Sequence, residues 1–309
     1  MNALDQLTPM VLTVITASTP LVFAALGELV TEKSGVLNLG VEGMMVIGAL
    51  AAFAVSSMSG SATLGIMAGA LAGAGLALIF AFLTLSLLAN QVATGLALTI
   101  FGVGLSALAG AGFVGVALKP LAKLDIPGLS SIAVIGPILF NHDVLVYLSF
   151  TMVAGVFWFL TRTRSGLILR AVGVSHSSAH AVGLPVIRTR YLATLFGGLM
   201  SGLGGAYLSL SYTTMWAENM TAGRGWIALA LVVFSTWRPV HLLAGAYLFG
   251  FITVLQLHAQ GAGFDVPSQV MSMMPYLATI LVLVLISKNK IKILKIAPAS
   301  LGKPFLSIK

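Results

Sequence analysis

The sequence contains no cysteine, and only 8 of its 309 residues are acidic. Without cysteine, the chain can have no disulfide framework, no thiolate metal site and no cysteine nucleophile. Charged residues of both signs make up 8% of the chain, against about a quarter in soluble domains. This is too little charge to solvate a globule of this length, so the composition excludes a soluble protein and predicts a chain that lies mostly in lipid.

Apolar residues fill most of the sequence, at 58% of the chain and a mean hydropathy of +1.05. Because a transmembrane helix needs about 20 apolar residues, we predict an all-α polytopic membrane protein with about nine spans, in a range of eight to ten. Residues 1–287 would form one membrane domain and residues 288–309 a basic tail. The segment 132–140 could enter the membrane without crossing it, and 225–237 is short for a crossing. The predicted spans are 9–27, 38–57, 63–88, 92–115, 145–161, 191–212, 225–237, 240–258 and 270–287.

The basic residues divide unevenly between the two sides of this map, thirteen against three. Cytoplasmic loops carry an excess of Lys and Arg, so we expect the N-terminus outside, the C-terminus in the cytoplasm and a multi-pass protein of the cell membrane. The net charge of +8 then reflects orientation and contact with lipid headgroups, and we expect no nucleic-acid partner. The three bases on the outer side are Lys119, Lys123 and Arg224; the thirteen on the inner side are Lys33, Arg162, Arg164, Arg170, Arg188, Arg190, Arg238, Lys288, Lys290, Lys292, Lys295, Lys303 and Lys309.

Glycine is abundant, at 34 residues. Gly65, Gly69 and Gly73 repeat every four residues, as do Gly198 and Gly202. Such small-residue faces let helix backbones approach closely. We expect these faces to pack within one subunit, with dimerisation as the minority alternative.

The predicted inner loop 162–190 is the most informative segment. Ser175 can cap a helix N-terminus, Gly183 stands where a C-terminal glycine belongs and Pro185 prevents continuation. These residues predict a helix of about two turns, which is marginal alone and needs a packing partner. The alternative is a solvated loop held at the headgroups by its arginines. His176 and His180 share a helix face, but no third ligand or acid lies near them in sequence, so we expect no metal site.

Four blocks of sequence resemble one family. Arg170-Ala171-Val172-Gly173, followed by a short helix and Gly183, looks like the coupling loop of ABC importer permeases of the ribose, simple-sugar, nucleoside and branched-chain amino-acid group. Residues 27–49 and 220–239 are similar to the two signatures of its nucleoside and simple-sugar branch, and residues 90–104 match a weaker third block. The short nucleoside permease subunit is the nearest type.

This resemblance implies a transport subunit that is not an enzyme and works by alternating access. ATP and Mg would be bound by a separate ABC ATPase, because the chain has no phosphate-binding loop of its own and needs no cofactor. The other implied partners are an extracellular nucleoside-binding protein and a second permease; a heterodimer is favoured, with a homodimer left open. The residues assigned to ATPase contact are Arg170, Ala171, Gly173, Ser175, His176, Ser178, His180 and Gly183.

The chain departs from the family pattern at two places. Residues 174–178 stand where the family often has Asn and acidic residues, and Ser235 stands where a glycine is common. We expect the partner ATPase to carry a matching difference.

Glu42 is the clearest acid within the predicted spans. Intramembrane carboxylates face an interior or a cavity, and the nearby Asn38 suits a helix that is broken inside the membrane. Glu42 could line the substrate pathway or clamp the broken helix, and we favour the clamp slightly because a nucleoside is neutral. Since an ion-coupled carrier would be expected to have several such acids, this scarcity argues against ion coupling.

Other residues could contact the cargo or its binding protein. Asn90 and Gln91 could meet a leaving substrate or simply cap the fourth span, and capping is the favoured interpretation. Tyr207, Tyr212 and Trp216 could form an interfacial belt or stack on a nucleobase. On the outer side, Arg224 could dock an acidic binding protein or pair with Glu218.

Two other functions stay open at this point. A simple sugar could replace the nucleoside as cargo, or the chain could be an ATP-independent secondary transporter. A purely structural anchor would leave the loop 162–190 unexplained.

Overall fold

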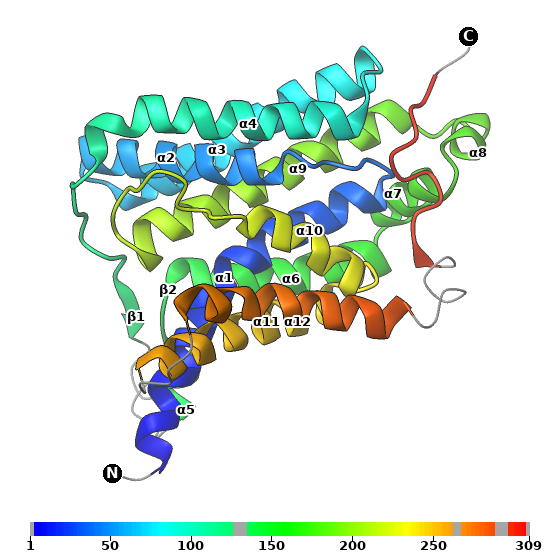
Figure 1. The fold of residues 1–309 in the computed structure, drawn as a ribbon. Coiled ribbons are helices and arrows are strands. Elements are labelled where there is room, and N and C mark those ends of the chain that lie inside the picture. The colour runs from blue at the N-terminus through cyan, green and yellow to red at the C-terminus, as the bar shows by residue number, and fades with distance from the viewer. Residues whose placement is uncertain (1–2, 126–134, 262–266, 288–295, 307–309) are drawn as a thin grey trace.

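The long apolar stretches of the sequence form helices that run side by side (Figure 1). This computed structural model describes residues 3–125, 135–261, 267–287 and 296–306. The predicted all-α class is confirmed. The helices are α1 (Ala3–Lys33), α2 (Val41–Ser59), α3 (Ala62–Ala81), α4 (Gln91–Gly110), α5 (Ile135–Phe140), α6 (Val144–Arg162), α7 (Arg164–Val174), α8 (His176–Ala181), α9 (Val186–Tyr207), α10 (Arg224–Phe234), α11 (Pro239–Gly261) and α12 (Ser268–Ser287). Single π-helical turns at Phe82–Ser86 and Leu208–Tyr212 extend α3 and α9, and a 3-10 turn at Ala111–Phe113 extends α4.

All nine predicted spans correspond to helices. Seven are long and apolar enough to cross a bilayer: Thr8–Lys33, Val41–Ser59, Ala62–Ser86, Gln91–Phe113, Val144–Arg162, Val186–Tyr212 and Pro239–Gly261. α10 has 11 residues, so it extends about 16 Å and cannot cross a core of about 30 Å alone. α12 covers the last predicted span. The exact number of crossings stays a prediction.

A small hairpin interrupts the helices between α4 and α6. β1 (Lys123–Asp125) pairs antiparallel with β2 (Asn141–Asp143), so that Lys123 lies opposite Asp143. α5 directly precedes β2 and covers 135–140 of the segment expected to enter the membrane, while residues 132–134 lie outside the described part. Six residues extend only about 9 Å, so α5 does not cross.

The core forms where α9 packs against α1, α2 and α3. Gly73 of α3 lies against Gly198 and Gly202 of α9, and Gly69 lies against the carbonyl oxygen of Gly48 in α2. A Cβ at Gly73 would come within 2.8 Å of Gly202 Cα, so the backbones meet directly. The prediction that the glycine faces pack within one subunit is confirmed.

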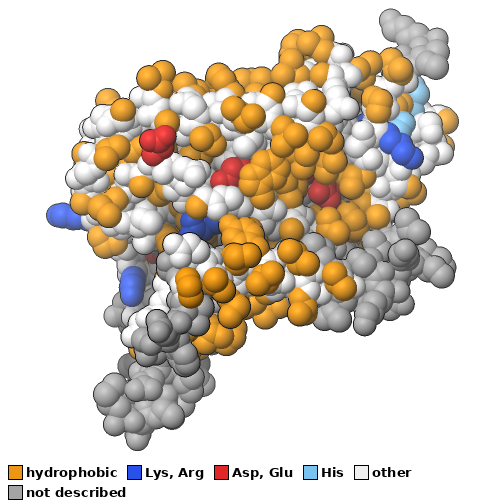
Figure 2. Space-filling model, in the orientation of Figure 1, with side chains coloured by type: hydrophobic (Ala, Val, Ile, Leu, Met, Phe, Trp, Pro, Cys, Tyr) orange, Lys and Arg blue, Asp and Glu red, His pale blue; other side chains and the backbone are white. Residues whose placement is uncertain are grey.

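The outer surface of the bundle is apolar over most of the face shown in Figure 2. Large side chains such as Leu71 of α3 and Ile100 and Leu108 of α4 are more than half exposed. Most of the described basic side chains gather at one end of the helices instead. At the end that carries α7 and α8, opposite the β1–β2 hairpin (Figure 1), lie Lys33, Arg162, Arg164, Arg170, Arg188, Arg190 and Arg238. The molecule therefore has an apolar belt and one strongly basic end.

Candidate functional site

The chain breaks between α1 and α2, where residues 34–40 form a mostly buried loop. A buried backbone group without a partner is costly, and here buried side chains of α1 and α4, together with Asn38 of the loop itself, supply the partners. The predicted helix break is therefore present, and Asn38 and Gln91 both help to hold it. The bonds run from Leu37 N–H to Gln91 Oε1 (2.8 Å), from Asn38 N–H to Glu28 Oε1 (3.1 Å), from Gly40 N–H to Asn38 Oδ1 (2.9 Å) and from Thr99 Oγ1 to Leu39 O (3.0 Å).

Glu42 lies in the first turn of α2, just after this break, and is 3% exposed. Its carboxylate accepts three hydrogen bonds, from Thr221 Oγ1 (2.5 Å), Gly223 N–H (2.8 Å) and Gly225 N–H (2.6 Å). The two amides belong to the start of α10, where Gly223 is at the N-cap position and has no side chain to cap with. A carboxylate at a helix N-terminus satisfies free amides and complements the helix dipole. Glu42 thus caps α10 from a different helix.

Glycine makes this contact between α2 and α10 sterically feasible. Gly223 has φ +81°, a conformation that other residues adopt only with strain. A Cβ on Gly225 would lie 2.6 Å from Glu42 Cα. The block 220–239 therefore supplies the glycines that bring α10 against the carboxylate.

A second carboxylate holds the other end of α10. Trp237, three residues beyond the helix, donates from Nε1 to Glu32 Oε2 (2.5 Å). Glu32 and Glu28 are 1% and 0% exposed and lie inside the membrane-length helix Thr8–Lys33. The premise that Glu42 is the clear intramembrane acid was wrong, because hydropathy alone placed the end of the first span at residue 27. Their i, i+4 spacing before Gly35 was the signal that could have identified them.

The other predicted pathway residues occupy different settings. Asn90 caps α4, accepting from Ala93 N–H at 3.0 Å, which agrees with the capping interpretation. Tyr207 and Trp216 are 0% and 2% exposed, so neither ring is on the lipid surface or open to a cargo in this conformation. Tyr212 is half-buried beneath the guanidinium of Arg224, whose Cζ lies 5.5 Å from the ring centroid.

Arg224 also donates from Nη1 to Met220 O at 3.0 Å, while the Glu218 side chain is exposed. Arg224 is thus anchored to its own loop. Glu218 remains free to meet solvent.

The predicted short helix in the loop 162–190 is confirmed as α8. Ser175 is its N-cap and accepts from Ser178 N–H at 3.2 Å. Gly183 has φ +80° and donates to His180 O at 2.9 Å, as a C-terminal glycine does. The cap residues therefore set both ends of α8.

The segment Arg170–Gly173 belongs to a separate helix, α7, that packs against the end of α1. Val172 is fully buried, and a Cβ at Gly173 would collide with Lys33 O. Arg170 is exposed. The Arg-Ala-Val-Gly pattern thus packs α7 on α1 and leaves the arginine at the surface, near Lys33 and Arg238.

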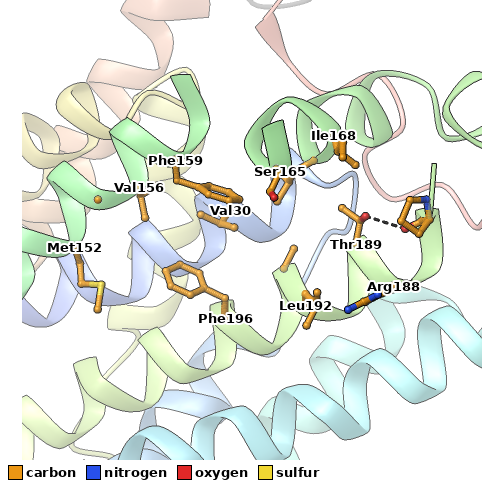
Figure 3. A pocket seen from close by; sticks show the side chains of 14 residues that line it. Val30, Met152, Val156, Phe159, Ser165, Ile168, Arg188, Thr189, Leu192 and Phe196 are labelled. Carbon is orange, nitrogen blue, oxygen red and sulfur yellow. Dashed lines mark hydrogen bonds between the residues drawn. The ribbon is translucent and has the colours of Figure 1, made fainter. Parts of the chain in front are cut away.

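A cavity of about 580 Å³ lies between α1, α6, α7 and α9 (Figure 3). Met152, Val156 and Phe196 line its apolar part, while Arg188 and Thr189 lie toward the α7 end. A nucleoside or sugar carries many hydroxyl groups that would need partners. We therefore do not assign a polar cargo to this cavity.

Comparison with known proteins identifies the chain's relatives. The family model for the permease component of branched-chain amino acid transport systems matches residues 10–286. The chain is 42% identical to TsgC13 of Haloferax volcanii, provisionally named a glucose ABC transporter permease, over 87% of this chain and 88% of that protein. It is 33% identical to the guanosine ABC transporter permease NupQ of Bacillus subtilis (85% and 87%) and 32% identical to the nucleoside ABC transporter permease NupC of Lactococcus lactis (92% and 94%).

No solved structure matches the chain. The family match spans nearly all of the membrane helices described above. With its polytopic helical fold, the chain therefore belongs to the permease family of branched-chain amino acid transport systems and is a membrane-spanning subunit of the ABC transporter type.

Proposed function

We propose that this chain is the membrane subunit of an ATP-driven importer, with ATP and Mg bound by a partner ATPase that contacts α8. The observation that carries the proposal is the position of α8. It is a capped, largely exposed helix connected by a short turn to α9, which packs against α1, α2 and α3. A displacement of α8 therefore reaches the core of the bundle through one short connection.

The residues for this contact lie around α8. Arg170, Ser178, His180 and Gly183 are exposed, and Ser175 and His176 are half-buried. Ala171 and Gly173 contribute by packing α7. A basic and polar surface of this kind fits an acidic groove on the ATPase.

We place the basic end in the cytoplasm and the opposite end outside. The support is the cluster of arginines around α7 and the starts of α9 and α11, because cytoplasmic loops are enriched in Lys and Arg. In this orientation α8 faces the compartment that holds ATP. The exposed Glu218 and the anchored Arg224 then lie on the outer side, where an extracellular binding protein would dock.

The proposed cargo is a nucleoside or a related ribosyl compound. Relatives named for guanosine and nucleoside transport, which align with most of this chain, support this choice. A simple sugar is the second candidate, supported by the 42% identity with a protein provisionally named for glucose. Both cargoes are neutral, so neither requires a charged site in the pathway.

Glu42 would act as a clamp in this mechanism rather than as a cargo ligand. All three of its hydrogen bonds go to the chain itself, and it is 3% exposed. A permease that moves a neutral solute and receives its energy from ATP needs no intramembrane counter-charge. A second permease subunit, as in heterodimeric members of the family, would complete the pathway.

The cargo is tested by uptake into proteoliposomes that contain the complete complex and internal ATP. Labelled guanosine, adenosine, ribose and glucose are supplied separately, each with its own binding protein. Saturable uptake of guanosine or adenosine, competed by the other nucleoside, is the expected result. Uptake of glucose alone would replace the nucleoside with the sugar, and uptake of none of the four would reject both cargoes.

A further inference from the structure

The C-terminal segment 296–306 is packed on the basic end of the bundle rather than extending away as a free tail. Ser300 N–H donates to Gly173 O at 2.9 Å, and Gly302 N–H donates to Gly35 O at 3.2 Å. His176 N–H, at the start of α8, donates to Ser300 Oγ at 3.3 Å. The segment thus connects the end of α1, the end of α7 and the start of α8.

Phe305 is the apolar anchor of this segment. It is 9% exposed and forms a small core with Val172 of α7, Ala179 of α8 and Val186 of α9. Its ring centroid lies 5.3 Å from the rings of both His176 and His180, with interplanar angles near 68°. Edge-to-face pairs of this kind are favourable. Phe305 therefore contacts the two largest side chains of α8.

Arg190, in the first turns of α9, contacts the same C-terminal segment. It is 1% exposed and donates to Ser34 O (3.2 Å) and Lys303 O (3.1 Å). Its Nη2 lies 3.4 Å from His176 Nδ1. Because a guanidinium has no acceptor, a hydrogen bond at this contact requires Nδ1 to accept, as it does in the neutral ring with its proton on Nε2.

We propose that the segment Ser300–Phe305, which we name the C-terminal clasp, positions α8 for its partner. A six-residue helix is not stable alone and takes its orientation from tertiary packing. α8 buries only Ala179 fully, and the ring of Phe305 packs against one edge of each of its two histidines. With the clasp in place, a displacement of α8 is transmitted to α1 and α9 through these contacts. Without it, α8 pivots between Ser175 and Gly183. The positioning role of the clasp rests on the proposed function. The contacts of the clasp with α7, α8 and α9 do not depend on that function.

The packing itself is tested without any partner. Since the natural sequence has no cysteine, Val182→Cys and Leu306→Cys introduce the only two spin-label sites, both on exposed side chains. Pulsed electron–electron double resonance on the purified chain should give one narrow distance distribution. Adding Phe305→Ala should broaden it, and adding Phe305→Tyr should leave it narrow. An unchanged distribution with Phe305→Ala would overturn the clasp.

The positioning role is tested in the complete complex by the ratio of ATP hydrolysed to cargo moved. Phe305→Ala should raise this ratio several-fold, because hydrolysis continues while α8 no longer transmits the movement. Phe305→Tyr should keep the ratio of the unmodified complex. The control is Leu306→Ala, at an adjacent residue that is 67% exposed, and it should not change the ratio. A broadened distance distribution with an unchanged ratio would reject positioning. Failure of the proposed function is a separate result, because the unmodified complex would then show no ATP-dependent uptake.

Discussion

At the scale of single residues, the buried acids of this chain act as acceptors for neighbouring elements. Glu28 accepts from the α1–α2 loop, Glu32 accepts from the indole of Trp237, and Glu42 accepts from the start of α10. A hydrogen bond to a carboxylate is stronger in a low-dielectric interior than in water. These three side chains therefore connect the α1–α2 loop and both ends of α10 to the helices α1 and α2.

Two substitutions of Glu42 should distinguish the effect of losing its charge from the effect of losing its hydrogen-bond acceptors. Glu42→Leu leaves three donors without an acceptor, at about 1–3 kcal/mol each, and we expect loss of assembled protein. Glu42→Gln keeps one acceptor oxygen and should retain expression and much of the transport. The measurements are yield after size-exclusion chromatography and cargo uptake.

The matched control is Glu218→Gln, which neutralises an exposed acid and should not change the yield. Normal uptake by the Glu42→Leu protein would contradict both interpretations of Glu42, as a clamp and as a pathway residue.

At the scale of elements, α3 offers a direct test of the glycine contact with α9. Gly73→Ala would place a Cβ within 2.8 Å of Gly202 Cα, and we expect a loss of about 1–3 kcal/mol from overpacking. Gly75→Ala lies two residues along the same helix with nothing within 4 Å. It should be neutral or stabilising by up to about 1 kcal/mol. Thermal unfolding in detergent compares the two, and equal midpoints would show that α3 and α9 do not meet there.

The contact of α8 with the clasp should weaken in acid. Burial, followed by the nearby Arg190 and Lys303, lowers the pKa of His176 below its usual 6.5. A free histidine takes up a proton near pH 6.5, while His176 in the clasp resists it, so stability is complete above about pH 6.5 and declines as the pH falls. Protonation at Nδ1 also removes the acceptor for Arg190. The groups that face His176 are Arg190, Lys303, Ser300 and Phe305.

The measurement is the spin-label distance distribution between pH 7.5 and 5.5, which should broaden with acid in the parent. His176→Asn places an amide atom where Nδ1 was and does not titrate, so its distribution should be independent of pH. An equal acid response in both proteins would assign the change to another group.

Local sequence features predicted the parts of the fold that depend on neighbouring residues. The cap residues Ser175 and Gly183 were sufficient to place α8, and the spacing of Gly69 and Gly73 was sufficient to predict close packing. The end of α1 was misplaced because Glu28 and Glu32 lower the local hydropathy, although partners distant in sequence make their burial favourable. The same limit applies to Phe305, since a basic tail gives no local sign that it folds back on α8.

In the candidate site, too, neighbouring residues in the sequence predicted some features, while features set by residues distant in sequence were missed. Asn38 and Glu42 were identified because polar residues inside an apolar segment are conspicuous. Their bonding partners follow only from tertiary packing: residue 28 from the fold of the α1–α2 loop against α1, and residues 221–225 from the packing of α2 against α10. The burial of Tyr207 and Trp216 was likewise unpredictable, because an aromatic residue near a helix end is equally typical of a lipid interface and of a core.

At the scale of the whole molecule, the described parts of the chain form a continuous series of packing contacts from the basic end to the middle of the bundle. α8 and the clasp lie at the basic end, α9 continues from α8 into the glycine-packed core, and Glu42 connects α2 to α10 within that core. This arrangement suits a subunit in which a movement of α8 at one end changes the packing of the short helix α10 inside the bundle. A carrier driven by an ion gradient would need no such exposed, capped helix.

The most direct test of this account is cargo uptake by proteoliposomes reconstituted with and without the ATPase subunit. The permease and binding protein are held constant, and ATP is enclosed in every sample. The account predicts uptake only when the ATPase is present, and its loss when the enclosed nucleotide is non-hydrolysable. Uptake at the same rate without the ATPase would contradict it.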